Sequence, residues 1–140
     1  MEGKGYIVPK NLVEVMQGAW YSEMLNTALD LELFDYLEEY GPLPAALVAE
    51  RLELNPNMTK DLLAGLAAMN ILNKDMNENF SNTEETKTYA IKKNPLYIGN
   101  HLMFHGGVRD NSFKNLKERI TNKIKPVFEQ NSKDVFNDAY

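Results

Sequence analysis

A chain of 140 residues with 44% hydrophobic content suits one compact domain. It contains no cysteine, which excludes disulfides, thiolate metal ligands and cysteine nucleophiles, and we expect a reducing, cytoplasmic location. The sequence shows neither a signal-peptide pattern nor a run of about 18 apolar residues, so we expect a soluble protein with no membrane partner.

The net charge of -5 is unevenly distributed along the chain. Residues 1–50 carry nine acidic residues against two lysines, whereas residues 51–140 carry eleven acidic residues against thirteen basic ones. An acidic N-terminal region repels phosphate polyanions, so this pattern disfavours nucleic acid as a partner.

The first expected helix, about Leu12–Leu31, has more apolar residues than one helix face can hold. A helix that packs on its own core has about three apolar positions in seven. The surplus predicts a subunit interface, and the alternative is a helix wrapped by its own domain; an interruption is expected near Gly18. The apolar and aromatic residues are Leu12, Val13, Val15, Met16, Ala19, Trp20, Tyr21, Met24, Leu25, Ala28, Leu29 and Leu31.

Three shorter helices are expected next. The first, Glu32–Tyr40, ends at Gly41-Pro42, because glycine suits a helix C-terminus and proline cannot continue the hydrogen-bond ladder. The second spans Pro44–Leu52, and Asn55-Pro56 precedes a third that begins near Asn57. The inward residues are expected to be Leu33, Phe34 and Leu37 in the first, Leu47, Val48 and Leu52 in the second, and Leu62, Leu63, Leu66, Met69 and Ile71 in the third.

A short hairpin is expected after these helices. Residues 71–74 and 79–82 flank the polar turn of residues 75–78. The order of three helices and a hairpin predicts a mainly α, winged helix-turn-helix-like fold, with extra N- and C-terminal helices used for dimerisation.

The two elements that would touch DNA in such a fold are poorly suited to it. On the third helix, Lys60 is opposed by Asp61, and no Arg or Gln is present to read base edges. The remaining polar-side positions of this helix are Thr59, Ala64, Gly65, Ala67 and Ala68. At the hairpin, Lys74 stands against Asp75 and Glu78, which gives a net negative charge. A winged-helix transcription regulator is therefore kept only as an alternative function. A stand-alone protein-interaction module is a second alternative.

Several segments together resemble the N-terminal dimerisation domain of S-adenosylmethionine-dependent O-methyltransferases. They are LDLELFDYL (29–37), GPL (41–43), VAERLELNP (48–56), LLAGLAAMNIL (62–72) and YIGNHL (97–102). The resemblance implies a homodimer formed through the N-terminal helices, and one wall of a pocket for a small-molecule acceptor. It also implies residues 1–125 as the dimerisation domain and residues 126–140 as the start of a connector to a methyltransferase domain.

The catalytic part of such an enzyme is not expected within these residues. The family's cofactor domain has a glycine-rich loop after its first strand, but the eight glycines here form no such cluster, and Gly106-Gly107 is only a dipeptide. We therefore assign no catalytic and no cofactor-binding residue, and we expect the chain alone to be inactive. S-adenosylmethionine is implied only for the absent catalytic domain.

His101 and His105 lie four residues apart on an expected helix, which is a spacing that metal sites use. No acidic residue of that helix completes a ligand set, so no metal is expected. By the resemblance, the candidates for the acceptor pocket are Tyr97, His101, Met103, Phe104 and His105, with Trp20 and Tyr21 reaching toward a partner's pocket. The alternative is that these residues serve ordinary packing and surface roles.

A last helix is expected over Asn111–Lys125. Phe113, Leu116, Ile120 and Ile124 would form its apolar face. The other face carries Lys114, Lys117, Arg119, Lys123 and Lys125, which we interpret as a solvated face.

Overall fold

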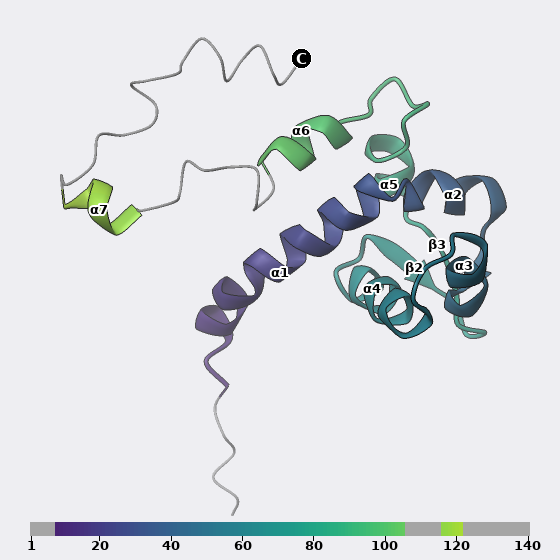
Figure 1. Ribbon diagram of the computed structural model, residues 1–140, viewed down its shortest axis with the longest axis horizontal. Coiled ribbons are helices and arrows are strands. Elements are labelled where there is room, and N and C mark those ends of the chain that lie inside the picture. The colour runs from purple at the N-terminus through teal and green to yellow at the C-terminus, as the bar shows by residue number, and fades with distance from the viewer. Residues whose placement is uncertain (1–7, 106–115, 122–140) are drawn as a thin grey trace, which may run out of the picture.

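The computed structural model describes residues 8–105 and 116–121 and confirms a mainly α fold with a small hairpin (Figure 1). In chain order the elements are α1 (Lys10–Asp30), α2 (Leu33–Tyr40), β1 (Leu43–Pro44), α3 (Ala45–Arg51), α4 (Pro56–Ala68), β2 (Leu72–Lys74), β3 (Asn79–Asn82), α5 (Glu84–Tyr89), α6 (Gly99–His105) and α7 (Leu116–Ile120).

Helix α1 is one continuous helix of 21 residues, so the expected interruption near Gly18 was wrong. A single glycine inside a helix costs about 1 kcal/mol relative to alanine, which is too little to break a helix of this length. Figure 1 shows α1 reaching well beyond the globular body that the other helices and the sheet form. Its buried residues are Ala28 and Leu29, both in its last turn.

Helices α2 and α3 start and end within one residue of the expected positions, and α4 starts one residue before the expected Asn57. At the α1–α2 junction, Glu32 adopts a left-handed backbone conformation with φ of 55°. At the start of α4, Pro56 occupies the first turn, and the side-chain oxygen of Asn55 accepts a hydrogen bond from Met58 N at 3.0 Å. This pair satisfies one of the otherwise unpaired amides of a helix N-terminus.

The sheet has three antiparallel strands in the order β1-β3-β2. Strands β2 and β3 form the expected hairpin, with Asn73 opposite Ser81. In the turn, Asp75 Oδ1 accepts hydrogen bonds from the backbone amides of Asn77 and Asn79. Strand β1, which pairs Leu43 with Phe80, was not predicted, because two residues that include a proline carry no strand pattern.

The core lies between α2, α3, α4 and the sheet. Its largest fully buried side chains are Phe34, Leu33, Leu63, Leu66 and Val48. The structure corrects part of the expected burial pattern, because Leu47, Leu52, Leu62, Met69 and Ile71 are only partly buried. Thr59, expected on the polar side of its helix, is 4% exposed, since that side of the first turn of α4 faces inward.

Asn82, at the end of β3, ties the sheet to α2. Its side-chain amide donates to the backbone oxygen of Phe34 and to Glu38 Oε2, each at 2.9 Å. The side chain is buried. Buried amides that are hydrogen-bonded in this way fix the position of one element on another.

Helix α5 was not predicted, because its six residues carry no apolar period. Its signal was the Thr83 cap, whose hydroxyl accepts a hydrogen bond from Thr86 N at 3.3 Å. Helix α6 contacts α1 and adds Leu102 and Met103 to the edge of the core. Helix α7 is the described part of the helix expected over residues 111–125, whose remaining residues, like residues 126–140, lie outside the described ranges.

Candidate functional site

The N-terminal part of α1 exposes a stripe of apolar side chains. Leu12, Val15, Met16 and Trp20 are 74%, 80%, 64% and 66% exposed. Their spacing places them along one side of the helix, together with the exposed Ala19. We call these five residues the α1 stripe. A row of large apolar side chains in water is typical of a surface that binds another protein.

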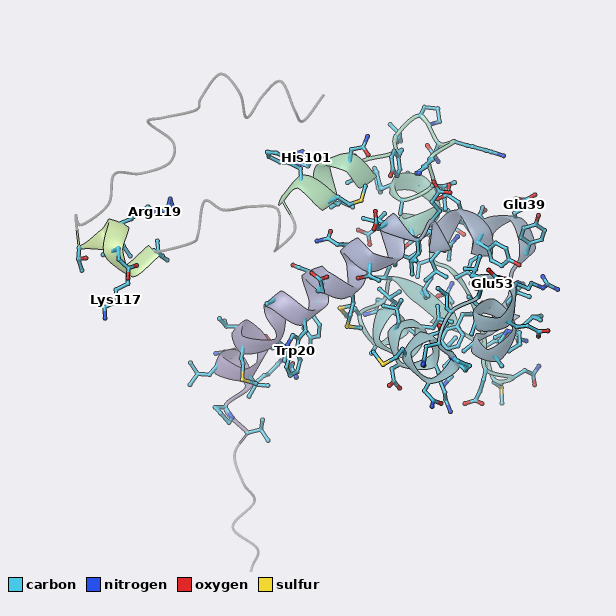
Figure 2. All side chains as sticks on the ribbon, in the orientation of Figure 1. Trp20, Glu39, Glu53, His101, Lys117 and Arg119 are labelled. Atoms are coloured by element: carbon cyan, nitrogen blue, oxygen red, sulfur yellow. The ribbon has the colours of Figure 1, made fainter. Side chains whose placement is uncertain are left out.

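The α1 stripe lies on a part of the helix that the other described residues leave exposed. Figure 2 labels Trp20 on α1 short of the region where the helix meets the globular body. An isolated helix of this length is marginally stable in water, and most helices are stabilised by packing an apolar face. A partner that covers the stripe would supply this packing.

An open groove continues from the α1 stripe toward α4. Its volume is about 390 Å³, and α1, α4 and the turn before α4 line it. The lining residues are Glu23, Met24, Thr27, Leu31, Leu54, Asn55, Met58, Thr59, Asp61 and Leu62. On α1, Glu23 and Met24 lie one helical turn beyond Trp20, so the stripe and the groove form one continuous surface.

Gly65 of α4 lies next to Met24, one of the residues that line the groove. A β-carbon at this position would overlap the terminal methyl group of Met24 on α1. The glycine therefore leaves room for the Met24 side chain at this point.

The expected pocket candidates near α6 fall into three groups of different accessibility. His101 is exposed, and Figure 2 labels it on α6. Met103 and Phe104 are half-buried, while the side chain of His105 lies outside the described residues. In Figure 2 His101 lies well apart from Trp20, although α6 contacts α1 elsewhere along its length.

Tyr97, which precedes α6, has a half-buried side chain. In the part of the chain that the structure describes, its hydroxyl oxygen is buried without a hydrogen-bond partner. Burial is the main cause that raises the pKa of Tyr97 above the ordinary value of 10.0, because it disfavours the phenolate. Gly99 lies beside it, and a β-carbon there would displace the Tyr97 ring from this position.

Lys92 anchors the segment between α5 and α6 to the α1–α2 junction. Its backbone amide donates to Asp35 Oδ1 at 3.0 Å, and its ammonium group pairs with Glu32. The hydrogen bond that the Lys92 ammonium donates to Glu32 is the main cause that raises the pKa of Lys92 above its ordinary value. These contacts hold the segment that leads to Tyr97 and α6 in place.

The surface that would face DNA in a winged helix has little free positive charge. At the hairpin, Lys74 pairs with Glu78 at 3.4 Å. Lys60 and Asp61 are both exposed on α4.

Within residues 8–105 and 116–121, no group of three or more His, Asp or Glu residues could hold a metal ion. None of the described helices is long and apolar enough to cross a membrane.

Residues 13–92 match the family of the O-methyltransferase dimerisation domain. The chain belongs to this family. Its exposed α1 stripe lies within a domain type that takes its name from subunit pairing.

Two curated relatives and one solved structure place this dimerisation domain among longer proteins. The chain is 30% identical over 135 residues to a human probable bifunctional dTTP/UTP pyrophosphatase/methyltransferase protein, covering 94% of the chain and 22% of that protein. It is 25% identical over 93 residues to the tetracenomycin polyketide synthesis 8-O-methyl transferase TcmO of Streptomyces glaucescens, covering 66% of the chain and 27% of that protein.

The fold of this dimerisation domain is also found in human N-acetylserotonin methyltransferase, solved in complex with S-adenosylmethionine. The TM-score is 0.78 at 22% identity, and the match covers 100% of this chain and 43% of that one. The dimerisation domain thus spans less than half of the length of each of these three proteins.

The groove is a feature of the dimerisation domain that the sequence reasoning missed. None of the six expected pocket candidates whose side chains the structure describes lines it. The signal was present in Gly65, a glycine inside a helix, because such a glycine often marks a close approach of two elements. Which residue approaches it, however, depends on the tertiary contact with α1.

Proposed function

We propose that this chain forms a homodimer through α1 and thereby pairs two subunits of an O-methyltransferase. The observation that carries the proposal is the exposed α1 stripe, which lies within a chain of the O-methyltransferase dimerisation family. Covering this surface removes apolar area from water, which is the main driving force for association.

Native mass spectrometry of the chain at tens of micromolar tests the homodimer. We expect a dimer for the wild type and a monomer for Val15→Asp, because a carboxylate in the stripe would lose its hydration on association. The matched control is Met76→Asp at the fully exposed tip of the β2–β3 turn, which we expect to remain dimeric. A wild type that stays monomeric at this concentration would contradict the proposal.

We further propose that the dimer serves a methyltransferase domain that follows residues 1–125, with residues 126–140 as the start of the connector. That domain would bind S-adenosylmethionine and transfer its methyl group to a hydroxyl of a small molecule. The longer methyltransferase relatives support this proposal. Titration calorimetry tests whether this chain alone binds S-adenosylmethionine, and we expect no heat when the cofactor is added to it.

A wall of the acceptor pocket is the proposed role of the α6 region. Its members would be Tyr97, His101, Met103, Phe104 and His105, with Trp20 and Tyr21 contributed by the partner subunit. The firm attachment of the segment before α6 through Lys92 supports this role, because a pocket wall must be fixed in position. In an assembled methyltransferase that contains this chain, we expect His101→Ala to raise KM for the acceptor without altering the dimer.

We propose that the chain binds neither nucleic acid nor a membrane. We also propose that it lies in the cytoplasm. The paired Lys74 and the exposed Asp61 support the first point. The lack of cysteine in the sequence supports a reducing compartment. A mobility-shift assay with salt-sensitive duplex binding at sub-micromolar protein would contradict the exclusion of DNA.

A further inference from the structure

The groove between α1 and α4 has the chemistry of a site for an aromatic side chain. Its walls are mostly apolar, with Met24, Leu31, Leu54, Met58 and Leu62 among the lining residues. Among the residues that the structure describes, the charged ones that line it are Glu23 and Asp61, and none is basic. An anionic ligand is therefore disfavoured, whereas an apolar group with a hydrogen-bond donor fits both the walls and the rim.

We propose that the groove binds Trp20 from the α1 stripe of a second copy of this chain. This inference rests on the homodimer proposed above and names the contact at its centre. An indole ring buries a large apolar area, and its Nε1–H needs an acceptor once it is buried. The carboxylates of Glu23 and Asp61 at the groove provide such acceptors.

The position of Trp20 on α1 makes a reciprocal contact possible. Symmetric dimers use the same patch on both subunits, so the patch must contain both the inserted group and its receptor. Trp20 lies one helical turn before Glu23 and Met24, which line the groove. A two-fold axis that crosses α1 between Trp20 and Met24 places each Trp20 over the groove of the other subunit.

The exposed side chains on both sides of this contact agree with the arrangement. Trp20 is 66% exposed and Met58, on the α4 side of the groove, is 67% exposed in the single chain. Large aromatic residues that fill a partner's pocket are the usual energetic centres of interfaces. Trp20 is thus the anchor of the dimer and Met58 is part of its receptor.

The test compares Met58→Asp with Met76→Asp, two exposed methionines of which only Met58 lines the groove. We expect Met58→Asp to raise the dimer dissociation constant by roughly thirtyfold, the loss typical of an interface centre, and Met76→Asp to leave it unchanged. Analytical ultracentrifugation gives both constants, and circular dichroism checks that each variant is folded.

The fluorescence of Trp20 gives a second, independent measurement, because it is the only tryptophan of the chain. On dimerisation we expect its emission to shift to shorter wavelength and its quenching by acrylamide to fall. A wild-type dimer whose constant is unchanged by Met58→Asp, with Trp20 still open to acrylamide, overturns the groove contact but leaves the homodimer intact. A monomeric wild type overturns both proposals.

Discussion

Gly65 on α4 lies against the terminal methyl group of Met24 on α1, which a β-carbon at Gly65 would displace. This contact is one of the places where the long helix meets the globular body, and Met24 itself lines the groove. The glycine thus leaves room for the position that the Met24 side chain adopts.

Gly65→Ala tests this contact. Alanine favours a helix by about 1 kcal/mol over glycine, but the new β-carbon would force the terminal methyl group of Met24 to move. We expect Gly65→Ala to gain less in the free energy of unfolding, measured by urea denaturation, than a glycine replacement without such a neighbour. The control is Gly18→Ala on α1, where an added β-carbon meets nothing within 4 Å, and we expect it to stabilise the helix. An equal gain in both variants would contradict the contact between Gly65 and Met24.

Asn82→Asp tests the link between the sheet and α2. The new carboxylate would face the Phe34 carbonyl and the Glu38 carboxylate, in place of two donated hydrogen bonds of 2.9 Å. We expect the free energy of unfolding to fall by about 3 kcal/mol, since an unpaired buried charge is costly. Asn77→Asp in the exposed β2–β3 turn makes the same chemical change, and we expect it to shift stability by less than about 0.5 kcal/mol.

Tyr97→Phe tests the buried hydroxyl before α6. Because this hydroxyl has no partner among the described residues, its removal is expected to leave stability unchanged or to raise it by about 1 kcal/mol at neutral pH. Tyr89→Phe, at an exposed ring, is the matched control. A loss of stability in Tyr97→Phe at neutral pH would show that the hydroxyl has a partner.

Tyr97→Phe is also expected to change how the free energy of unfolding depends on pH. The pKa of Tyr97 is raised in the folded chain, mainly by burial, so the folded state binds its proton more tightly than the unfolded state does. The contribution of protonated Tyr97 to the free energy of unfolding is fully present below pH 10. It declines as the pH rises through the pKa of Tyr97 in the folded chain. We expect Tyr97→Phe to show a smaller alkaline loss than the wild type in urea denaturation above pH 10.

The helix content of α1 is expected to depend on protein concentration. Among residues 8–105 and 116–121 the α1 stripe has no packing partner, so we expect the turns that carry it to be marginally stable in a monomer. On dilution below the dimer dissociation constant, far-ultraviolet circular dichroism is expected to lose helical signal while the core stays folded. Val15→Asp would show the reduced signal at all concentrations.

The order of helices could be predicted because local signals mark it. Asn55-Pro56 and Gly41-Pro42 mark helix boundaries, and the surplus of apolar residues in α1 predicted an interface surface that the structure shows to be exposed. Strand β1 could not be predicted, because two residues gain strand structure only by pairing with β3.

The site was harder to predict than the fold. Trp20 was named as a candidate, but the groove was not, since it joins residues 23–31 of α1 to residues 54–62 around α4. Such a juxtaposition depends on tertiary packing and has no local sequence pattern. The expectation that Thr59 points outward was wrong for the same reason, because the neighbouring elements decide which side of a helix is covered.

The α1 stripe carries no charged side chain, and this has a kinetic consequence. Encounter between two such faces lacks attractive electrostatic steering, so association is expected at no more than about 10⁵–10⁶ M⁻¹s⁻¹. Because residues 1–50 of both copies are acidic, we expect added salt to screen their repulsion and to speed association. Once formed, a contact of this kind owes its lifetime to slow dissociation. Subunits that meet slowly and part slowly would exchange little after assembly, so each pair would keep its original members.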